Sequence, residues 1–407
     1  MKQLVREKYL SRIRPFFHDD MIKVLTGVRR CGKSTIMEQI RDELLRNGIN
    51  DDNIVYLNLD LKRYRRIKTP DELERIIDSL VNAKEGMRYL FIDEIQNVSN
   101  FEEIINSYRE EGFSIFITGS NSYLLSGELV TKLTGRYLEF RIMPFTLSEI
   151  RDYLTMNGYE FDSKKEFNDY LRYGGYPKRL QYEDTEAKGL YIRSVIEESM
   201  TKDILRNRNV RNKGLMERIL RLLFSTPGMT ISSNSIADYL KSEHVITQYQ
   251  TVIKYLDLIL SSGLASKCER FDIVGKKSLK TLYKSYVADP ALYTLYPTDR
   301  HELRMGALIE NIVHIELISR GYAVSVGRFR KHEVDFVVKK GVQVGYIQVS
   351  FTLSDSATEE REKAPLLRIE DGFPKYIITM DPIAMDTDGI HVLNLMDDFL
   401  LGDGFSL

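Results

Sequence analysis

The chain has 407 residues, of which 43% are hydrophobic and 29% charged, a composition typical of folded protein with room for two or three domains. The 58 basic and 59 acidic side chains nearly cancel, which excludes a uniformly basic nucleic-acid coat but not a local basic domain. Two cysteines exclude a disulfide framework or a cysteine-rich zinc site. No apolar run approaches the ~18–20 residues that span a bilayer, and the N-terminus lacks a signal-peptide core. We therefore expect a soluble cytoplasmic protein with no membrane partner.

Short apolar runs alternate with amphipathic helical patterns over the first 150 residues. The pattern predicts strands at 22–26, 54–59, 89–92 and 113–117, and helices at 34–46 and 70–81. Such alternation is typical of βαβ units with a parallel sheet, so the predicted fold class is α/β.

The segment between the first strand and the first helix matches the phosphate-loop pattern GxxxxGK[ST]. It reads Gly27-Val28-Arg29-Arg30-Cys31-Gly32-Lys33-Ser34-Thr35. The two glycines let the backbone N–H groups face a β-phosphate, and the helix N-terminus adds partial positive charge. We expect Lys33 to reach the β- and γ-phosphates and the Ser34 hydroxyl to ligate Mg²⁺. The segment therefore predicts a site for ATP and Mg²⁺. We interpret Cys31 as a small spacer, with a redox-sensitive thiol as the alternative.

The apolar strand at 89–92 runs directly into two acids, Asp93 and Glu94. Asp93 is expected to hold Mg²⁺, directly or through water, and Glu94 to position and polarise the attacking water. Many strands end in an acid, but an acidic pair after a phosphate loop favours hydrolysis over nucleotide binding alone.

Two further candidates follow the strand at 113–117. Ser120 or Asn121 would face the γ-phosphate from the end of this strand, unless the segment is a plain polar loop. Arg136 would neutralise transition-state charge, in cis or from a neighbouring subunit of an oligomer, unless it is a solvated surface arginine.

Beyond residue 145 the pattern becomes mostly helical, interrupted at Gly174-Gly175-Tyr176-Pro177, which predicts a turn. Residues 207–296 show a helix near 235–241, a second helix that ends at Gly263, and two strands around a turn at 272–277. This order favours a winged helix, with any other small α+β module as the alternative.

The remainder of the chain is α/β again. It contains a helical pattern at 304–320 and strand patterns at 324–326, 333–338, 344–350 and 376–379. Charge is uneven between the two last regions. Residues 206–296 carry fourteen basic and seven acidic side chains, a net +7, whereas 297–407 carry twelve and eighteen, a net −6.

Several of these motifs together resemble one family, the prokaryotic AAA-superfamily ATPases that join a P-loop domain to a conserved C-terminal domain of uncertain role. The motifs span nearly the whole chain. They are Gly27–Arg30 before Cys31–Ser34, Phe91–Gln96, Thr118–Ser122 with Leu133–Arg136, Pro144–Glu149 and Gly174–Pro177.

The resemblance implies ATP binding and hydrolysis but no particular substrate. It also implies four domains: an AAA-like P-loop ATPase core at 1–145, a helical lid at 146–205, a winged helix at 206–298 and a smaller endonuclease-like α/β domain at 299–407.

Nucleases of that last fold use an acid on a helix, an Asp on one strand and Glu-x-Lys on the next. Glu310 and Asp335 match the first two positions, but Gln348 and Ser350 stand where Glu and Lys are expected. A neutral amide oxygen is a weaker ligand for a hard cation, and a hydroxyl cannot replace an ammonium. We therefore expect a degenerate fold without nuclease activity, although Glu333 could partly substitute as a ligand.

Two basic segments suggest nucleic-acid contacts. Lys62-Arg63-Tyr64-Arg65-Arg66-Ile67-Lys68 suits phosphate contacts with Tyr64 stacking on a base, or is a solvated loop. The proposed wing adds Lys276, Lys277 and Lys280, which favour duplex DNA as a partner. Winged helices also bind proteins, so a protein partner stays open.

Three hypotheses follow from these features. The first is a Mg²⁺-dependent ATPase that acts on DNA or a nucleoprotein partner. The second is a nucleotide-gated switch for protein interactions with slow turnover, and the third, which Gln348 and Ser350 disfavour, is an ATP-dependent nuclease.

Overall fold

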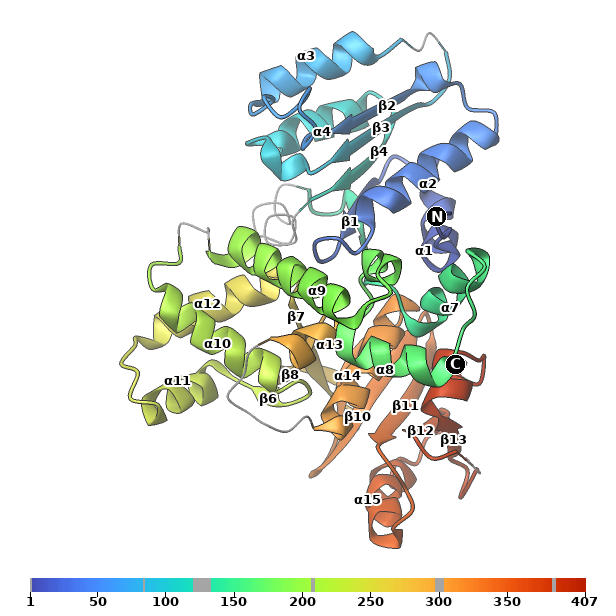
Figure 1. Cartoon of the computed structure of the whole chain (residues 1–407), viewed down its shortest axis with the longest axis vertical. Helices are drawn as coiled ribbons and strands as arrows, with labels where there is room; N and C mark the ends of the chain where they lie inside the picture. The colour runs from blue at the N-terminus through green and yellow to red at the C-terminus, as the bar shows by residue number, and fades with distance from the viewer. Residues whose placement is uncertain (1, 83–84, 120–132, 206–208, 297–303, 383–385) are drawn as a thin grey trace. The chain divides into compact units, whose positions relative to one another are not determined.

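The computed structural model describes residues 2–82, 85–119, 133–205, 209–296, 304–382 and 386–407 (Figure 1). Contacts divide the chain into two compact units. The N-terminal unit consists of residues 3–142 with 261–263, and the C-terminal unit of 143–260 and 264–407 with 1–2. Within the described residues, every helix is too short or too polar to cross a membrane.

A sheet of five parallel strands forms the centre of the N-terminal unit, in the order β2-β3-β4-β1-β5. The strands are β1 (Ile22–Thr26), β2 (Ile54–Asn58), β3 (Arg88–Asp93), β4 (Phe113–Thr118) and β5 (Tyr137–Arg141). The predicted α/β class and parallel sheet are confirmed. The sequence analysis missed β5, a half-buried edge strand without a long apolar run.

Helices cover both faces of this sheet (Figure 1). Helices α3 (Pro70–Leu80) and α4 (Phe101–Glu110) pack the apolar residues of one face into a core. Helices α1 (Glu7–Ile13) and α2 (Lys33–Arg46) lie on the other side, with the short helix η1 (Arg14–Phe16). Because the strands are parallel, their carboxyl ends meet at the edge where residues 27–32 lead into α2.

The C-terminal unit begins with helices and continues into an eight-stranded sheet (Figure 1). The helices are α7 (Leu147–Met156), α8 (Ser163–Tyr173), α9 (Thr185–Ser199), α10 (Lys213–Ser225), α11 (Ser233–Ser242), α12 (Tyr249–Ser262), α13 (Pro290–Leu295), α14 (Met305–Ser319) and α15 (Ser356–Leu367). The strands are β6 (Thr230–Ile231), β7 (Ala265–Asp272), β8 (Lys277–Val287), β9 (Ala323–Phe329), β10 (His332–Lys340), β11 (Gln343–Ser350), β12 (Lys375–Thr379) and β13 (His391–Asn394).

The strand order in this sheet is β13-β12-β11-β10-β9-β7-β8-β6. The β7–β8 hairpin belongs to the predicted winged helix, and β9 belongs to the predicted endonuclease-like domain. The two strands β7 and β9 pair in parallel, with Arg270 opposite Val326 and Asp272 opposite Arg328. One sheet therefore runs across the boundary expected near residue 298. The assignments as lid, winged helix and endonuclease-like domain stay predictions.

Candidate nucleotide site

The loop between β1 and α2 has a backbone that requires glycine at two positions. Gly27 has φ +143°, and a Cβ atom there would lie 2.2 Å from the carbonyl oxygen of Ile142. Gly32 has φ +102° and directly precedes α2. The left-handed region is costly for other residues, so these two positions explain the glycines of the motif.

The side chain of Lys33 is folded against this loop. Its Nζ donates to the carbonyl oxygens of Gly27 at 2.9 Å and Val28 at 3.2 Å, and the residue is buried. The loop's own carbonyls therefore hold the ammonium at the phosphate loop.

Arg6, an arginine that the sequence analysis missed, supports the phosphate loop through a hydrogen bond. Arg6 is buried, and its Nη1 donates to the carbonyl oxygen of Cys31 at 3.0 Å. Its backbone N–H donates to Oε1 of Gln39 on α2 at 3.2 Å. Arg6 thus ties the segment before α1 to both the loop and the helix. No local signal marks it, because it lies in an ordinary charged stretch.

Asp93 ends β3 among side chains from two neighbouring strands. Asn58, at the end of β2, donates from Nδ2 to Oδ2 of Asp93 at 2.9 Å. Thr118, at the end of β4, donates its hydroxyl to Oδ1 of the same carboxylate. These contacts hold the Asp93 carboxylate at the edge of the sheet that carries the phosphate loop.

Glu94 follows Asp93 in an unusual backbone conformation, with φ 61° and ψ 45°. Its N–H donates to Oγ1 of Thr118 at 3.1 Å, and its carboxylate accepts from Nε2 of Gln96. Burial raises the pKa of Glu94, although the positive charge of Lys33 opposes this. A left-handed backbone conformation is strained for a residue other than glycine, so the contacts around Glu94 must hold it in place. These contacts therefore fix the direction of the Glu94 side chain.

The residues present fit a nucleotide with Mg²⁺. Asp93 and Ser34 offer the hard oxygen ligands that Mg²⁺ prefers. Oε1 of Gln96 is buried without a hydrogen-bond partner, so the site still lacks one donor that a bound group or water would supply. Across the described ranges, no group of three or more His, Cys, Asp or Glu is arranged to hold a metal by itself.

A family model described as an AAA domain matches residues 19–151. An uncharacterized protein of Haemophilus influenzae is 34% identical over 399 residues, which are 96% of this chain and 97% of that protein. The chain belongs to the AAA-type P-loop ATPase family.

Further comparisons found another relative and a solved structure that are similar to this chain. An uncharacterized protein of Methanocaldococcus jannaschii is 28% identical over 361 residues, 86% of this chain and 79% of that protein. The solved structure of a Walker-type ATPase of Pyrococcus abyssi gives a TM-score of 0.53 at 16% identity, and covers 72% of this chain and 95% of that one. The likeness to that structure shows the fold alone. A second family model, a domain of unknown function, matches residues 164–299.

The AAA domain does not bring every predicted site residue to the loop. Arg136 precedes β5, where its carbonyl accepts from the N–H of Ile22, and its guanidinium donates to Asn106 on α4 at 3.1 Å. It therefore lies at the amino edge of the sheet, about 13 Å from the loop by strand length. Asn121 and Ser120 lie outside the described residues, and the roles of all predicted site residues stay predictions.

Other loop residues occupy different environments. Cys31 is a buried residue of the loop itself, which agrees with the spacer interpretation. Arg30 is exposed and has φ 61°, whereas Arg29 is half-buried. Thr35, near the start of α2, accepts from Nε2 of Gln3 at 3.5 Å.

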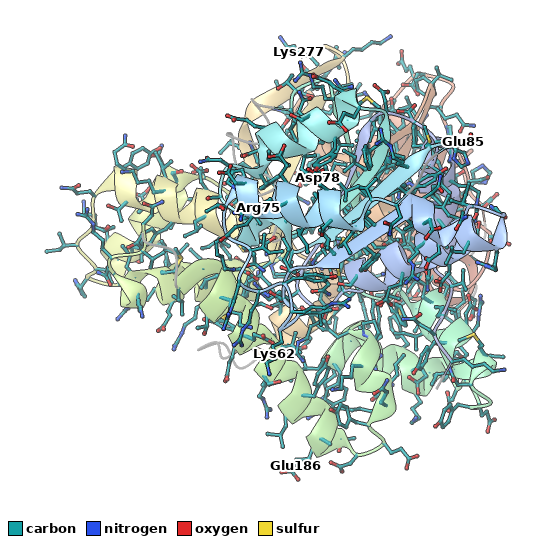
Figure 2. The ribbon with its side chains drawn as sticks, turned by 90° about the horizontal axis from the view of Figure 1, so that it is seen from above. Lys62, Arg75, Asp78, Glu85, Glu186 and Lys277 are labelled. Carbon is teal, nitrogen blue, oxygen red and sulfur yellow. The ribbon has the colours of Figure 1, made fainter. Side chains whose placement is uncertain are left out.

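The predicted base-stacking role of Tyr64 is wrong. Its ring is buried in the core of the AAA domain, beneath Arg63 with 4.6 Å between the guanidinium carbon and the ring centre. The surrounding basic side chains are exposed, and Figure 2 shows Lys62 among them. This segment can offer charge but no aromatic platform.

The residues that match the nuclease positions lie together in the C-terminal unit. Glu310, Asp335, Gln348 and Ser350 line a pocket of about 440 Å³. The Gln348 amide is held by two hydrogen bonds, because Oε1 accepts from the N–H of Asp335 at 2.7 Å and Nε2 donates to Glu362 at 2.8 Å. These bonds use one lone pair of the amide oxygen and tie the side chain to protein groups.

Proposed function

We propose that this protein is a Mg²⁺-dependent ATP hydrolase that acts on DNA or a nucleoprotein partner. The observation that carries the hydrolase proposal is the placement of Asp93 and Glu94 at the sheet edge that holds the phosphate loop, both fixed by Thr118. A protein that only binds nucleotide needs no oriented second carboxylate.

In this proposal each residue has a separate task. The loop N–H groups bind the phosphates, and Lys33 turns from the carbonyl of Gly27 toward them. Asp93 and Ser34 hold the Mg²⁺, which supplies charge stabilisation when bound. Glu94 orients a water molecule and takes up its proton, and its raised pKa makes it a better proton acceptor.

The hydrolase proposal is tested by steady-state ATP hydrolysis with Mg²⁺ in the whole protein. Glu94→Gln should reduce turnover by about 100-fold or more while ATP still binds, because the base is lost and the cradle is intact. Glu103→Gln, on the exposed surface of α4, is the matched control and should hydrolyse normally. Equal turnover in wild type and Glu94→Gln would disprove hydrolysis at this site.

DNA as the partner is supported by a basic surface in the C-terminal unit. A pocket of about 720 Å³ lies between the turn of the β7–β8 hairpin, the β9–β10 turn and the end of α15. Four basic and two acidic residues line it; the basic ones are Lys276, Arg330, Lys331 and Arg368. Lys277 projects from the same hairpin turn (Figure 2), whereas the Lys280 side chain lies outside the described residues.

The proposal that DNA is the partner is tested by measuring duplex DNA binding and its dependence on salt. Replacing Arg330 and Lys331 by alanine should weaken binding and reduce the steepness of its salt dependence, because fewer phosphates are neutralised. Lys164→Ala on exposed α8 is the control. ATP turnover that rises with DNA favours the remodelling function, and turnover indifferent to DNA favours the nucleotide-gated switch with a protein partner.

A further inference from the structure

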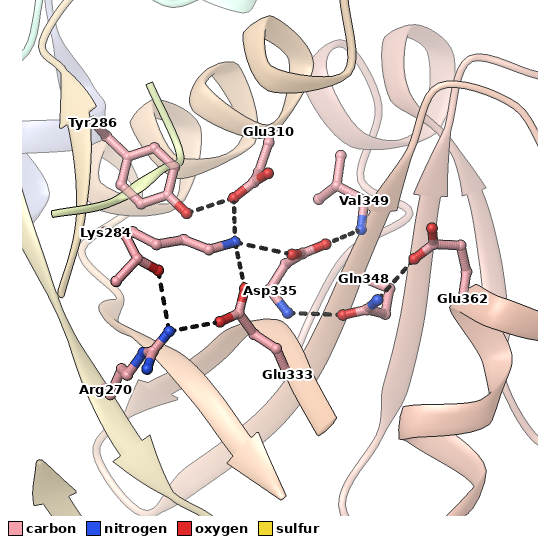
Figure 3. Close-up of polar contacts among 10 residues, drawn as sticks. Arg270, Lys284, Tyr286, Glu310, Glu333, Asp335, Gln348, Val349 and Glu362 are labelled. Carbon is pink, nitrogen blue, oxygen red and sulfur yellow. Dashed lines mark hydrogen bonds and ion pairs between the residues drawn. The ribbon is translucent and has the colours of Figure 1, made fainter. Parts of the chain in front are cut away.

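One lysine ammonium lies among three carboxylates in the C-terminal unit (Figure 3). Nζ of Lys284 is 2.9 Å from Oε1 of Glu310, 2.9 Å from Oε1 of Glu333 and 3.2 Å from Oδ1 of Asp335. The lysine side chain is only 7% exposed, and those of Glu310 and Asp335 are each 16% exposed. The Glu333 side chain is 40% exposed, so the buried ammonium is the centre of an anionic cluster that is open to solvent on the Glu333 side.

The lysine and the carboxylates come from different parts of the chain. Lys284 is on β8, in the hairpin of the predicted winged helix, where it is opposite Cys268 of β7. Glu310 is on α14, and Glu333 and Asp335 are on β10. The three ion pairs therefore connect the hairpin to the region of the predicted endonuclease-like domain.

The remaining contacts orient the carboxylates around the ammonium. Tyr286, two residues along β8, donates its hydroxyl to Oε1 of Glu310 at 2.6 Å. The N–H of Val349 donates to Oδ2 of Asp335 at 3.0 Å. Arg270 donates to Oε2 of Glu333 at 3.1 Å, so three carboxyl groups and two basic side chains meet in this cluster (Figure 3).

We propose that Lys284 is the built-in cation of this cluster: its ammonium occupies the position that a divalent cation would need, and it joins β8 to α14 and β10 without a metal. The proposal concerns the C-terminal unit and does not depend on ATP hydrolysis.

The distances from the carboxylate oxygens to the cation distinguish an ammonium site from a metal site. The oxygens lie 2.9–3.2 Å from Nζ, which are hydrogen-bond distances, whereas oxygen ligands lie about 2.0–2.6 Å from Mg²⁺ or Ca²⁺. With Lys284 in place the three carboxylates are thus spaced for an ammonium, and they would have to move closer together around a divalent ion that replaced it. This agrees with the finding that no described group of acids is arranged for a metal.

The charge balance favours the ammonium as a permanent occupant. Burial alone lowers the pKa of Lys284, but the charges of Asp335, Glu310 and Glu333 outweigh it and raise that pKa. A divalent ion would have to displace this ammonium or face its repulsion. Without the lysine, Glu333 would keep its ion pair with Arg270, whereas Glu310 and Asp335 would lose theirs, and such uncompensated carboxylates attract a cation.

The cluster also has an approach route for an ion. Glu310 and Asp335 line the pocket of about 440 Å³ that also contains Gly306 and Arg361. A cation that entered this pocket would reach two of the three carboxylates directly. Removing the ammonium should therefore convert an ion-pair cluster into a site for a divalent cation.

Mn²⁺ binding to the full chain without nucleotide at pH 8, counted by electron paramagnetic resonance, tests the proposal. Lys284→Ala should bind one more Mn²⁺ per chain than wild type. Its melting temperature should rise by about 5 °C at a hundredfold excess over Kd, because the metal binds only the folded state. The double variant Lys284→Ala/Asp335→Asn should lose the extra ion. The nucleotide site is the same in the single and the double variant, so Mn²⁺ bound there does not contribute to the difference.

Three results would overturn the proposal. Binding by wild type of a Mn²⁺ ion that depends on Asp335 would show that the ammonium does not occupy the cation position. Alternatively, Lys284→Ala could bind no additional ion, in which case the carboxylates are no cation cradle. Lys284→Met, which keeps the apolar stem of the side chain, is prepared in parallel with Lys284→Ala. Both variants are purified in buffer that contains Mn²⁺. Failure of both variants to fold with Mn²⁺ present would show that no other cation replaces the ammonium, and would also reject the proposal.

Discussion

Single buried charged side chains determine much of the chemistry of the N-terminal unit. Lys23, in the middle of β1, is fully buried and donates to the carbonyl oxygen of Asp19 at 2.9 Å and to Oγ of Ser114 at 2.8 Å. Its Nζ also lies 4.5 Å from the ring centre of Phe116. Burial lowers the pKa of Lys23 to about 7, although Asp19 and Asp20 oppose this.

Replacing Lys23 by methionine should change how stability depends on pH. The unfolded lysine keeps its proton up to about pH 10, while the folded one loses it near pH 7, so the free energy of unfolding of wild type should rise between these values. The slope should approach about 1.4 kcal/mol per pH unit, and the variant should lack it. Urea unfolding from pH 6.5 to 9.5 measures the difference, and a difference that is constant with pH would contradict the assigned pKa.

Arg6 acts on the nucleotide site from a distance along the chain. Arg6→Ala removes the hydrogen bond to the carbonyl of Cys31 and should weaken ATP binding about tenfold, because one charged hydrogen bond that holds the loop is lost. Titration with a fluorescent ATP analogue measures the affinity. The exposed Lys62 provides the control, since Lys62→Ala should bind normally, and equal affinities in both variants would refute the role of Arg6.

At the scale of elements, the turn after α8 is fixed by two glycines, Gly174 packed against the side chain of Asp289 and Gly175 against distant backbone. A Cβ on Gly175 would lie 1.9 Å from the carbonyl oxygen of Phe145, whose N–H in turn donates to Gly175 at 2.8 Å. The Gly175 N–H donates to Oδ2 of buried Asp289 at 2.8 Å. The turn predicted from the sequence is therefore also the place where the end of α8 packs against the starts of α7 and α13.

Gly175→Ala should lower the stability of the C-terminal unit by about 1–3 kcal/mol, because the added methyl group has no space. The matched control is Gly189→Ala in α9, where the nearest atom would be 3.8 Å away and alanine favours the helix. Thermal unfolding of both variants measures the effect. The interpretation fails if the two variants melt at the same temperature.

At the scale of the whole molecule, each of the two units contains a hydrophobic core built from described residues. One core lies between the five-stranded sheet and helices α3 and α4. The other lies within the eight-stranded sheet region and includes Ile273 of the hairpin turn as well as Val334 and Ile377. The hairpin thus shares a core with the strands that follow it, in addition to sharing a sheet.

A chain restricted to residues 143–407 should therefore fold cooperatively, because it contains its own core and its own sheet. If the proposed DNA surface is correct, this fragment should bind duplex DNA without ATP, and more weakly as salt rises. Calorimetry and fluorescence anisotropy measure the two properties. A fragment without a cooperative transition would show that the C-terminal unit depends on the AAA domain.

The sequence by itself determined the local parts of this protein. The loop at Gly27 and the acid at Asp93 follow from backbone freedom and from the position of a residue at a strand end, and both depend on neighbouring residues alone. Only the tertiary structure decided which distant side chains meet. It placed Arg6 under the loop, Tyr64 in the core and Lys284 among carboxylates 26 to 51 residues away. No local pattern encodes such contacts, because they depend on how separate elements pack.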